Sequence, residues 1–179
     1  MKALTLYQPW AWAVAWAGKP VENRQHAFPT FVMGRDVAIH GGLTMEVEAL
    51  EEIAGTFGAR PANYRLPGHT YTALAVGILS VGAVAAVVRM AGWVRVRRLE
   101  TSLSHDSFRS HLEVVNYAGI TSAEAEDAAK SGWAGGPYLW VMKEVRALEV
   151  PVLCSGERGL WDLPRNVEDL VLEQLQEGH

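Results

Sequence analysis

The segment Leu4-Thr5-Leu6-Tyr7-Gln8-Pro9-Trp10-Ala11-Trp12 joins a strand to a helix with no loop between them. Its pattern predicts a strand over residues 3–6 and a helix over residues 8–17, because proline suits the first helical position and Gly18 can end the helix in a left-handed conformation. The helix is apolar on every side. We expect four residues to face the core and Trp12 and Trp16 to lie on a neighbouring face. The four are Trp10, Ala13, Val14 and Ala17.

A charged segment follows directly, Gly18-Lys19-Pro20-Val21-Glu22-Asn23-Arg24, and it predicts a short strand over residues 20–24. Side chains alternate along a strand, so Glu22 and Arg24 share one face about 7 Å apart. One interpretation is a salt bridge on the wall of the fold. The other is a polar pocket, in which Lys19 and Arg24 attract a phosphate or a base carbonyl and Glu22 accepts from an amine or orients a water. Both interpretations stay open at this point.

Length and composition limit the class of protein. The chain has 179 residues, which we interpret as one domain over residues 1–179, with a C-terminal helical extension over residues 163–179. The single cysteine, Cys154, excludes an intrachain disulfide and favours a reducing compartment. The net charge of −4 gives no global attraction for nucleic acid, so any such binding must be local. Since no secretory signal follows Met1, we expect a cytoplasmic protein.

Residues 70–88 contain no charged side chain and have about the length that a membrane helix needs. Polar residues, glycines and β-branched residues within this segment favour a long, bent, buried strand instead, so we expect no membrane partner. A second strand is predicted over residues 93–99. Four arginines and no acidic residue lie between residues 86 and 99.

The arginine-rich segment also has two interpretations. Strand alternation puts Trp93, Arg95 and Arg97 on one face, which suits a sugar-phosphate backbone running past a stacking ring. The alternative is a solvated strand face with one packing tryptophan. Trp133 lies in the glycine-rich loop over residues 131–136, and its setting is typical of a mobile lid.

The rest of the chain supplies shorter elements. Strands are predicted over residues 36–40, 138–145 and 151–155, and a helix over residues 108–115. Three other helices have start signals: Thr44 as a cap, the capping box of Thr121 and Glu124, and Pro164 with Asn166. Strands with helices inserted between them, and no regular alternation of the two, predict an α+β fold.

The chain resembles the ASCH family, the domains named for homology to activating signal cointegrator-1. The family pattern Q-P-W, then G-K-x-x-E-x-R, then a late G-x-x-G-L-W is matched in order over residues 4–164. The matching residues are Gln8, Pro9, Trp10, Gly18, Lys19, Glu22, Arg24, Gly156, Gly159, Leu160 and Trp161. The resemblance implies a PUA-like fold, a small mixed β-barrel with helices packed around it. It also implies binding of RNA or single-stranded nucleic acid. We expect no metal, because the sequence has no H-x-x-x-H or C-x-x-C pair, and no cofactor.

The resemblance places the pocket between the first helix, the charged strand and the turn over residues 156–161. Expected ligand-binding residues are Gln8, Trp10, Lys19, Glu22, Arg24, His40, Trp93, Arg95, Arg97, Trp133 and Trp161. The alternative function is hydrolysis of a modified nucleoside, as in related enzymes that deacetylate N4-acetylcytidine, or a nuclease, with Lys19 and Glu22 as catalytic residues. Those deacetylases carry threonine where this chain has Glu22, which removes the hydroxyl nucleophile. A histidine in the setting of His40 is more often structural than catalytic.

Overall fold

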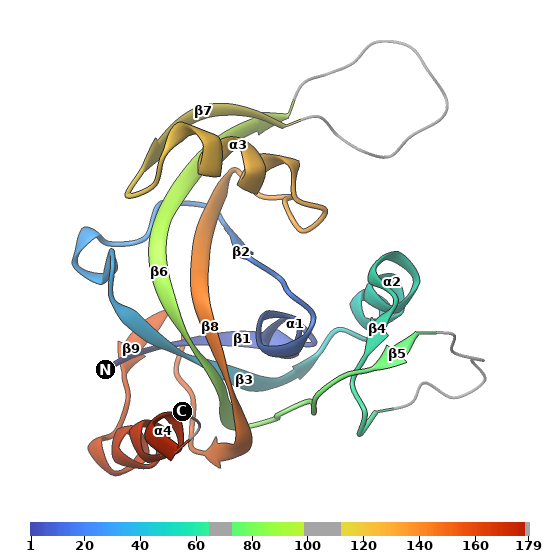
Figure 1. The fold of residues 1–179 in the computed structure, drawn as a ribbon, viewed down its shortest axis with the longest axis vertical. Helices are drawn as coiled ribbons and strands as arrows, with labels where there is room; N and C mark the ends of the chain where they lie inside the picture. Colours follow the sequence, from blue (N-terminus) through green and yellow to red (C-terminus); the bar gives the residue numbers. More distant parts are fainter. Residues whose placement is uncertain (65–72, 99–111, 178–179) are drawn as a thin grey trace. The chain divides into compact units, whose positions relative to one another are not determined.

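The computed structural model describes residues 1–64, 73–98 and 112–177, and it is a mixed α+β structure (Figure 1). Its helices are α1 Trp10–Trp16, α2 Val47–Phe57, α3 Ser122–Lys130 and α4 Arg165–Glu177, with a 3₁₀ turn at Thr30–Val32. Its strands are β1 Lys2–Gln8, β2 Val21–Arg24, β3 Asp36–Met45, β4 Ala59–Arg60, β5 Leu74–Ala75, β6 Ala83–Arg98, β7 Leu112–Ala118, β8 Tyr138–Leu153 and β9 Leu160–Asp162.

The chain divides into two compact units, each containing part of β6 and part of β8. The first unit consists of Met1–Lys19, Asp36–Val88 and Glu144–His179, and the second of Pro20–Arg35 and Arg89–Lys143. Neighbouring strands in the first unit follow the order β8-β6-β3-β1-β9, in which β1 is parallel to β3 and antiparallel to β9. The second unit has the order β2-β8-β6-β7, in which β2 is antiparallel to β8 and β7 to β6.

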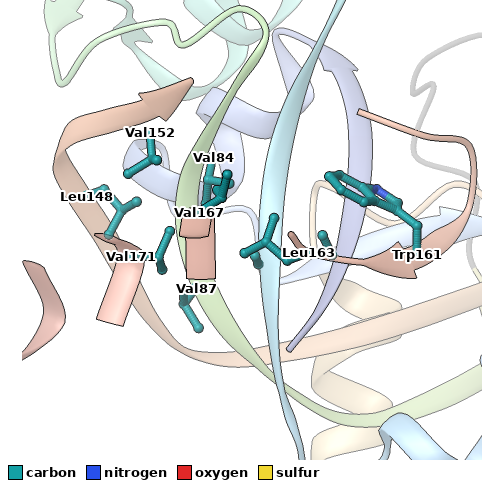
Figure 2. Close-up of a cluster of buried hydrophobic side chains, with 10 residues drawn as sticks. Val84, Val87, Leu148, Val152, Trp161, Leu163, Val167 and Val171 are labelled. Carbon is teal, nitrogen blue, oxygen red and sulfur yellow. The ribbon is translucent and has the colours of Figure 1, made fainter. Parts of the chain in front are cut away.

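The core of the first unit forms between the sheet and α4 (Figure 2). Val167 and Val171 lie one turn apart on α4 and are buried, and Leu175 is partly buried beside them, whereas Leu170 is exposed. They pack with buried side chains of the strands: Ala3, Ala38, Val84, Val87, Leu148, Val152, Trp161 and Leu163. Each of these larger side chains contributes about 1.5–3 kcal/mol by leaving water.

Helix α1 follows β1 directly, as the sequence predicts, and Gly18 has the expected left-handed conformation at φ 69°. The prediction for Trp12 was wrong. This ring is completely buried, and its Nε1 donates to the carbonyl of Val76 at 2.9 Å. Val76 is distant from Trp12 in the sequence, so the apolar periodicity of the helix alone did not identify the buried face.

Helix α2 begins later in the chain than the sequence predicts. Thr44 does not cap the helix, because β3 continues to Met45, which pairs with Gln8 of β1. Helix α2 begins at Val47 and ends at Phe57, and Gly58 caps it with a left-handed φ of 65°. Pairing with a distant strand therefore overrides a local capping signal.

The sequence predicted two strands, over residues 70–88 and 93–99. Where these residues are described, they contain the short β5 and one long strand, β6, which joins the two predicted strands. Residues 65–72 and 99–111 lie outside the described residues. Gly77 and Gly82 have positive φ and precede β6, so the glycines in this segment mark the approach to the strand rather than bends within it. In the described part of the chain, no helix has the length and apolar character to cross a membrane.

The strands predicted over residues 138–145 and 151–155 are likewise one strand, β8. Within it Glu144 has a left-handed φ of 47°. A residue in this conformation locally changes the course of a strand without ending it. Pro151 does not end it either, which agrees with the tolerance of strand edges for proline.

Helix α3 has the predicted capping box. The Thr121 hydroxyl accepts from the backbone of Glu124, and the Glu124 carboxylate accepts from the backbone of Thr121. The helix predicted over residues 108–115 was wrong for its described part, since residues 112–115 belong to β7 and pair with β6. The core of the second unit lies between α3 and one face of this sheet. Its buried members are Val21, Val94, Val96, Ala125, Ala128, Ala129, Leu139 and Val141.

Candidate functional site

The sheet of the second unit has two chemically different faces. Val21 pairs with Val141 and Asn23 with Leu139, and this face meets α3. Glu22 pairs with Trp140 and Arg24 with Tyr138, so by strand alternation these four side chains lie on the opposite face. The face-sharing predicted for Glu22 and Arg24 is therefore present, and β8 supplies two aromatic rings beside them.

Arg24 is held by an acid and by a ring. Its Nε lies 3.3 Å from Oε1 of Glu22, and its guanidinium carbon lies 5.3 Å from the centroid of Trp140. Trp140 is itself fixed, because its Nε1 donates to the carbonyl of His26 at 2.7 Å and Phe28 meets it edge-on at 5.5 Å. A cation over a fixed ring gains electrostatic stabilisation and has a defined orientation.

A second arginine lies over a ring on the same face. The guanidinium carbon of Arg95 is 6.0 Å from the centroid of Tyr138, and the Trp93 ring lies 5.7 Å from that of Tyr138 at an angle of 60°. Arg95 is exposed, and both rings are half-buried. We call the set of Arg24, Trp93, Arg95, Tyr138 and Trp140 the arginine–aromatic face.

Arg97 continues the alternation of β6 but is already bonded to an acid. Its Nε donates to Oε2 of Glu113 at 3.0 Å, and its Nη2 donates to the same oxygen. The two residues are paired directly between β6 and β7. Arg97 is therefore less available to an anion than Arg95, a difference that the sequence did not indicate.

The sequence predicted the charged strand and the arginine-rich segment as separate features, whereas the structure brings them together on β2, β8 and β6. Tyr138 connects them, because it pairs with Arg24 on one side and meets Trp93 and Arg95 on the other. Tyr138 was not among the predicted site residues. Its position opposite Arg24 depends on strand register, for which no local signal exists.

The loop that carries Trp133 is anchored to β2. The Asn23 amide donates to the Trp133 carbonyl at 3.0 Å and accepts from Gly135 at 2.9 Å and Gly136 at 3.1 Å. The Trp133 side chain packs, partly buried, against the core of the second unit. This anchoring gives Trp133 a structural role, and its contact with a ligand stays a prediction.

In the first unit, Lys19 is a buried cation, with 2 % of its surface exposed. Its Nζ lies 5.8 Å from the centroid of Trp10, whose Nε1 donates to Oε2 of Glu46 at 2.7 Å. Gln8 is also buried. Its amide donates to the Ser80 carbonyl and accepts from the backbone of Trp12 at 3.3 Å, so Gln8 is held inside the unit by both ends of its amide.

His40 and Trp161 form a second polar cluster in the first unit. Trp161 Nε1 donates to the Thr5 hydroxyl at 3.1 Å, which lies 3.4 Å from His40 Nδ1. His40 Nε2 lies 3.1 Å from the Cys154 carbonyl, and because a carbonyl only accepts, Nε2 carries the proton. Burial lowers the pKa of His40 below its usual value, against a smaller opposing effect of the Cys154 carbonyl.

Both ring nitrogens of His40 have partners inside the unit, which agrees with the structural interpretation of this residue. Burial also raises the pKa of the Cys154 thiol, which disfavours the thiolate. Among the residues that the structure describes, no group of three or more His, Cys, Asp and Glu side chains is placed to hold a metal ion.

The predicted site residues fall into both units. Gln8, Trp10, Lys19, His40 and Trp161 belong to the first, and Glu22, Arg24, Trp93, Arg95, Arg97 and Trp133 to the second. The single cleft expected from the sequence stays a prediction. Comparison with known proteins adds no relative: no family model matches the chain, and a search of curated proteins finds no significant match.

Proposed function

We propose that the protein binds RNA or single-stranded DNA through the arginine–aromatic face. The observation that carries this proposal is the pair of guanidinium groups held over aromatic rings on one sheet face, Arg24 over Trp140 and Arg95 over Tyr138. Arginine binds phosphate through a rigid fork of donors, and half-buried rings stack on bases without selecting among them. Such a face supplies local positive charge on a chain whose net charge is −4.

The proposal includes the family. We infer that the chain is an ASCH domain with a PUA-like barrel, acting in the cytoplasm as a single domain. Support comes from the ordered sequence pattern and from the mixed α+β structure. The structure also places Glu22 against Arg24, a role that differs from the threonine of the related deacetylases at the same position.

Titration of fluorescent 12-nucleotide RNA, single-stranded DNA and duplex DNA, each at several salt concentrations, tests the proposed function. We expect the single strands to bind more tightly than the duplex. Replacing Arg95 by glutamine should lower the salt dependence of single-strand binding by about 0.7 in the log-log slope, the value for one phosphate contact. Arg165→Gln removes the same charge from an exposed residue of the first unit and is the matched control. Equal effects of the two substitutions, or no binding at all, would reject the proposal.

The burial of Lys19 beside Trp10 favours a second candidate, hydrolysis of a modified nucleoside. Buried lysines are frequent catalytic groups, as general bases or as nucleophiles. Incubation with N4-acetylcytidine, with chromatographic detection of cytidine, tests this candidate. We expect little turnover, since Glu22 replaces the threonine nucleophile. Rapid release of cytidine that Lys19→Ala abolishes would make hydrolysis the primary function.

A further inference from the structure

The two arginine–ring contacts of the arginine–aromatic face occur at alternate residues of β8. Arg95 lies over Tyr138, and Arg24 lies over Trp140. Arg95 comes from β6 and Arg24 from β2, so the two cations flank β8 on opposite sides. Residues two apart on a strand are about 7 Å apart. The two positive charges are therefore offset along β8, and not only across it.

Each cation lies over a ring before any ligand arrives, and Arg24 also forms an ion pair with Glu22. The Arg24 guanidinium is fixed by the Trp140 ring and by Glu22, which lies on the Nε side. That arrangement leaves the two terminal amino groups of Arg24 as the fork that suits a phosphate. The Arg95 guanidinium lies over Tyr138, which also contacts Trp93. A ring thus lies next to each of the two cations.

We propose that Arg24 and Arg95 bind two successive phosphates of one single strand, which follows β8 and places a base at Trp93 and Tyr138. Glu22 is a positioning residue in this arrangement, because it holds Arg24 and has no contact of its own with the phosphate. The inference rests on the proposed function and adds to it the path of the strand. It also defines the smallest full ligand, a dinucleotide with two phosphates.

Two dinucleotides separate this arrangement from general attraction of anions. Dithymidylate with a 5′-phosphate carries two phosphates, and the same dinucleotide without it carries one. We expect the wild-type protein to bind the first about tenfold more tightly in calorimetric titrations. In Arg24→Gln and in Arg95→Gln this advantage should fall below about twofold, since each variant has one phosphate site left. Arg97→Gln should keep the advantage, because Arg97 is already bonded to Glu113.

The outcomes distinguish the inference from the proposed function. If the 12-nucleotide strands bind but the 5′-phosphate gives no advantage, or if the advantage survives in folded Arg24→Gln, the two-phosphate arrangement is wrong and the proposed function stands. Absence of any binding to the 12-nucleotide strands rejects both. Arg24→Lys is a second variant in case Arg24→Gln fails to fold. It keeps the charge but loses the fork. We expect it to keep about half, on a logarithmic scale, of the tighter binding that the 5′-phosphate gives to the wild type.

The role of Glu22 gives a test with opposite signs. Glu22→Gln removes a negative charge, so a purely electrostatic surface would bind the two-phosphate ligand more tightly. Loss of the position of Arg24 should instead weaken binding about threefold and reduce the 5′-phosphate advantage. The matched control is Glu113→Gln, which releases Arg97 and should not reduce that advantage. Tighter binding by Glu22→Gln would overturn the positioning role.

Discussion

The guanidinium carbon of Arg24 lies 5.3 Å from the centroid of the Trp140 ring. Arg24 is half-buried and Trp140 is buried, so the side chain proposed to bind phosphate rests on a side chain of the core. Trp140 in turn is fixed through His26 and Phe28. Changes that loosen Trp140 should therefore reduce stability and ligand affinity together.

Replacing Trp140 by phenylalanine tests this relationship. The variant loses the hydrogen bond from Nε1 to the His26 carbonyl and leaves unfilled volume. We expect the free energy of unfolding to fall by about 1–3 kcal/mol, measured by urea denaturation. Trp93→Phe is the control, because Trp93 is only half-buried, and it should cost clearly less. Equal losses would mean that Trp140 has no special place in the second unit.

Two glycines give a pair of predictions of opposite sign. A methyl group on Gly41 would lie 2.0 Å from the Ser80 carbonyl oxygen and 2.2 Å from Gln8 Nε2, so Gly41→Ala should destabilise the first unit by about 3 kcal/mol or more. Gly55 lies in α2, and a methyl group there would meet open space. Gly55→Ala should therefore stabilise the protein by about 0.5–1 kcal/mol. Thermal unfolding of both variants checks the signs, and a gain in stability for Gly41→Ala would contradict the close packing of Gly41 against Ser80.

Elements with complete local signals could be predicted from the sequence. Helix α1 has proline before it and glycine after it, and α3 has a capping box, so their types and ends were correct within about two residues. The strand ends were not predictable in this way. Strand β6 continues through Gly92. A Cβ atom at this position would lie 2.2 Å from the carbonyl oxygen of Ala118, so glycine is needed here to let β7 approach β6.

For the candidate site too, only the features that depend on local sequence could be predicted. Strand alternation correctly grouped Glu22 with Arg24, because alternation is a local property. Which residues of β8 and β6 lie beside them depends on register between strands distant in sequence. Tyr138 was therefore missed, and the Glu113 partner of Arg97 was missed with it.

Glu124 makes stability depend on pH in the acidic range. Its hydrogen bond from Lys143, followed by those from Thr121, lowers its pKa from 4.5 to about 2. Because the pKa is lower in the folded protein, this stabilisation is complete above about pH 4.5 and disappears as the pH falls towards 2. Wild type should be more stable than Glu124→Gln at pH 7, and the difference should shrink below pH 4.5 in chemical denaturation. A difference that does not change with pH would mean that the charge of Glu124 contributes nothing.

His40 should make stability depend on pH in a higher range. Burial lowers its pKa below the ordinary 6.5, because the ring has little contact with water, and the hydrogen bond from Nε2 to the Cys154 carbonyl offsets this lowering only in part. As the pH falls below 6.5, the unfolded chain takes up a proton that the folded protein resists, so the free energy of unfolding decreases. Above pH 6.5 both states are neutral at this residue and no such dependence remains. We expect the free energy of unfolding, measured by denaturation, to decrease between pH 7.5 and 5. His40→Asn should abolish this decrease, and His26→Asn, at an exposed position, should retain it. An NMR titration of the His40 ring with a midpoint at or above 6.5 would contradict this account, and with it the interpretation of His40 as a buried structural residue.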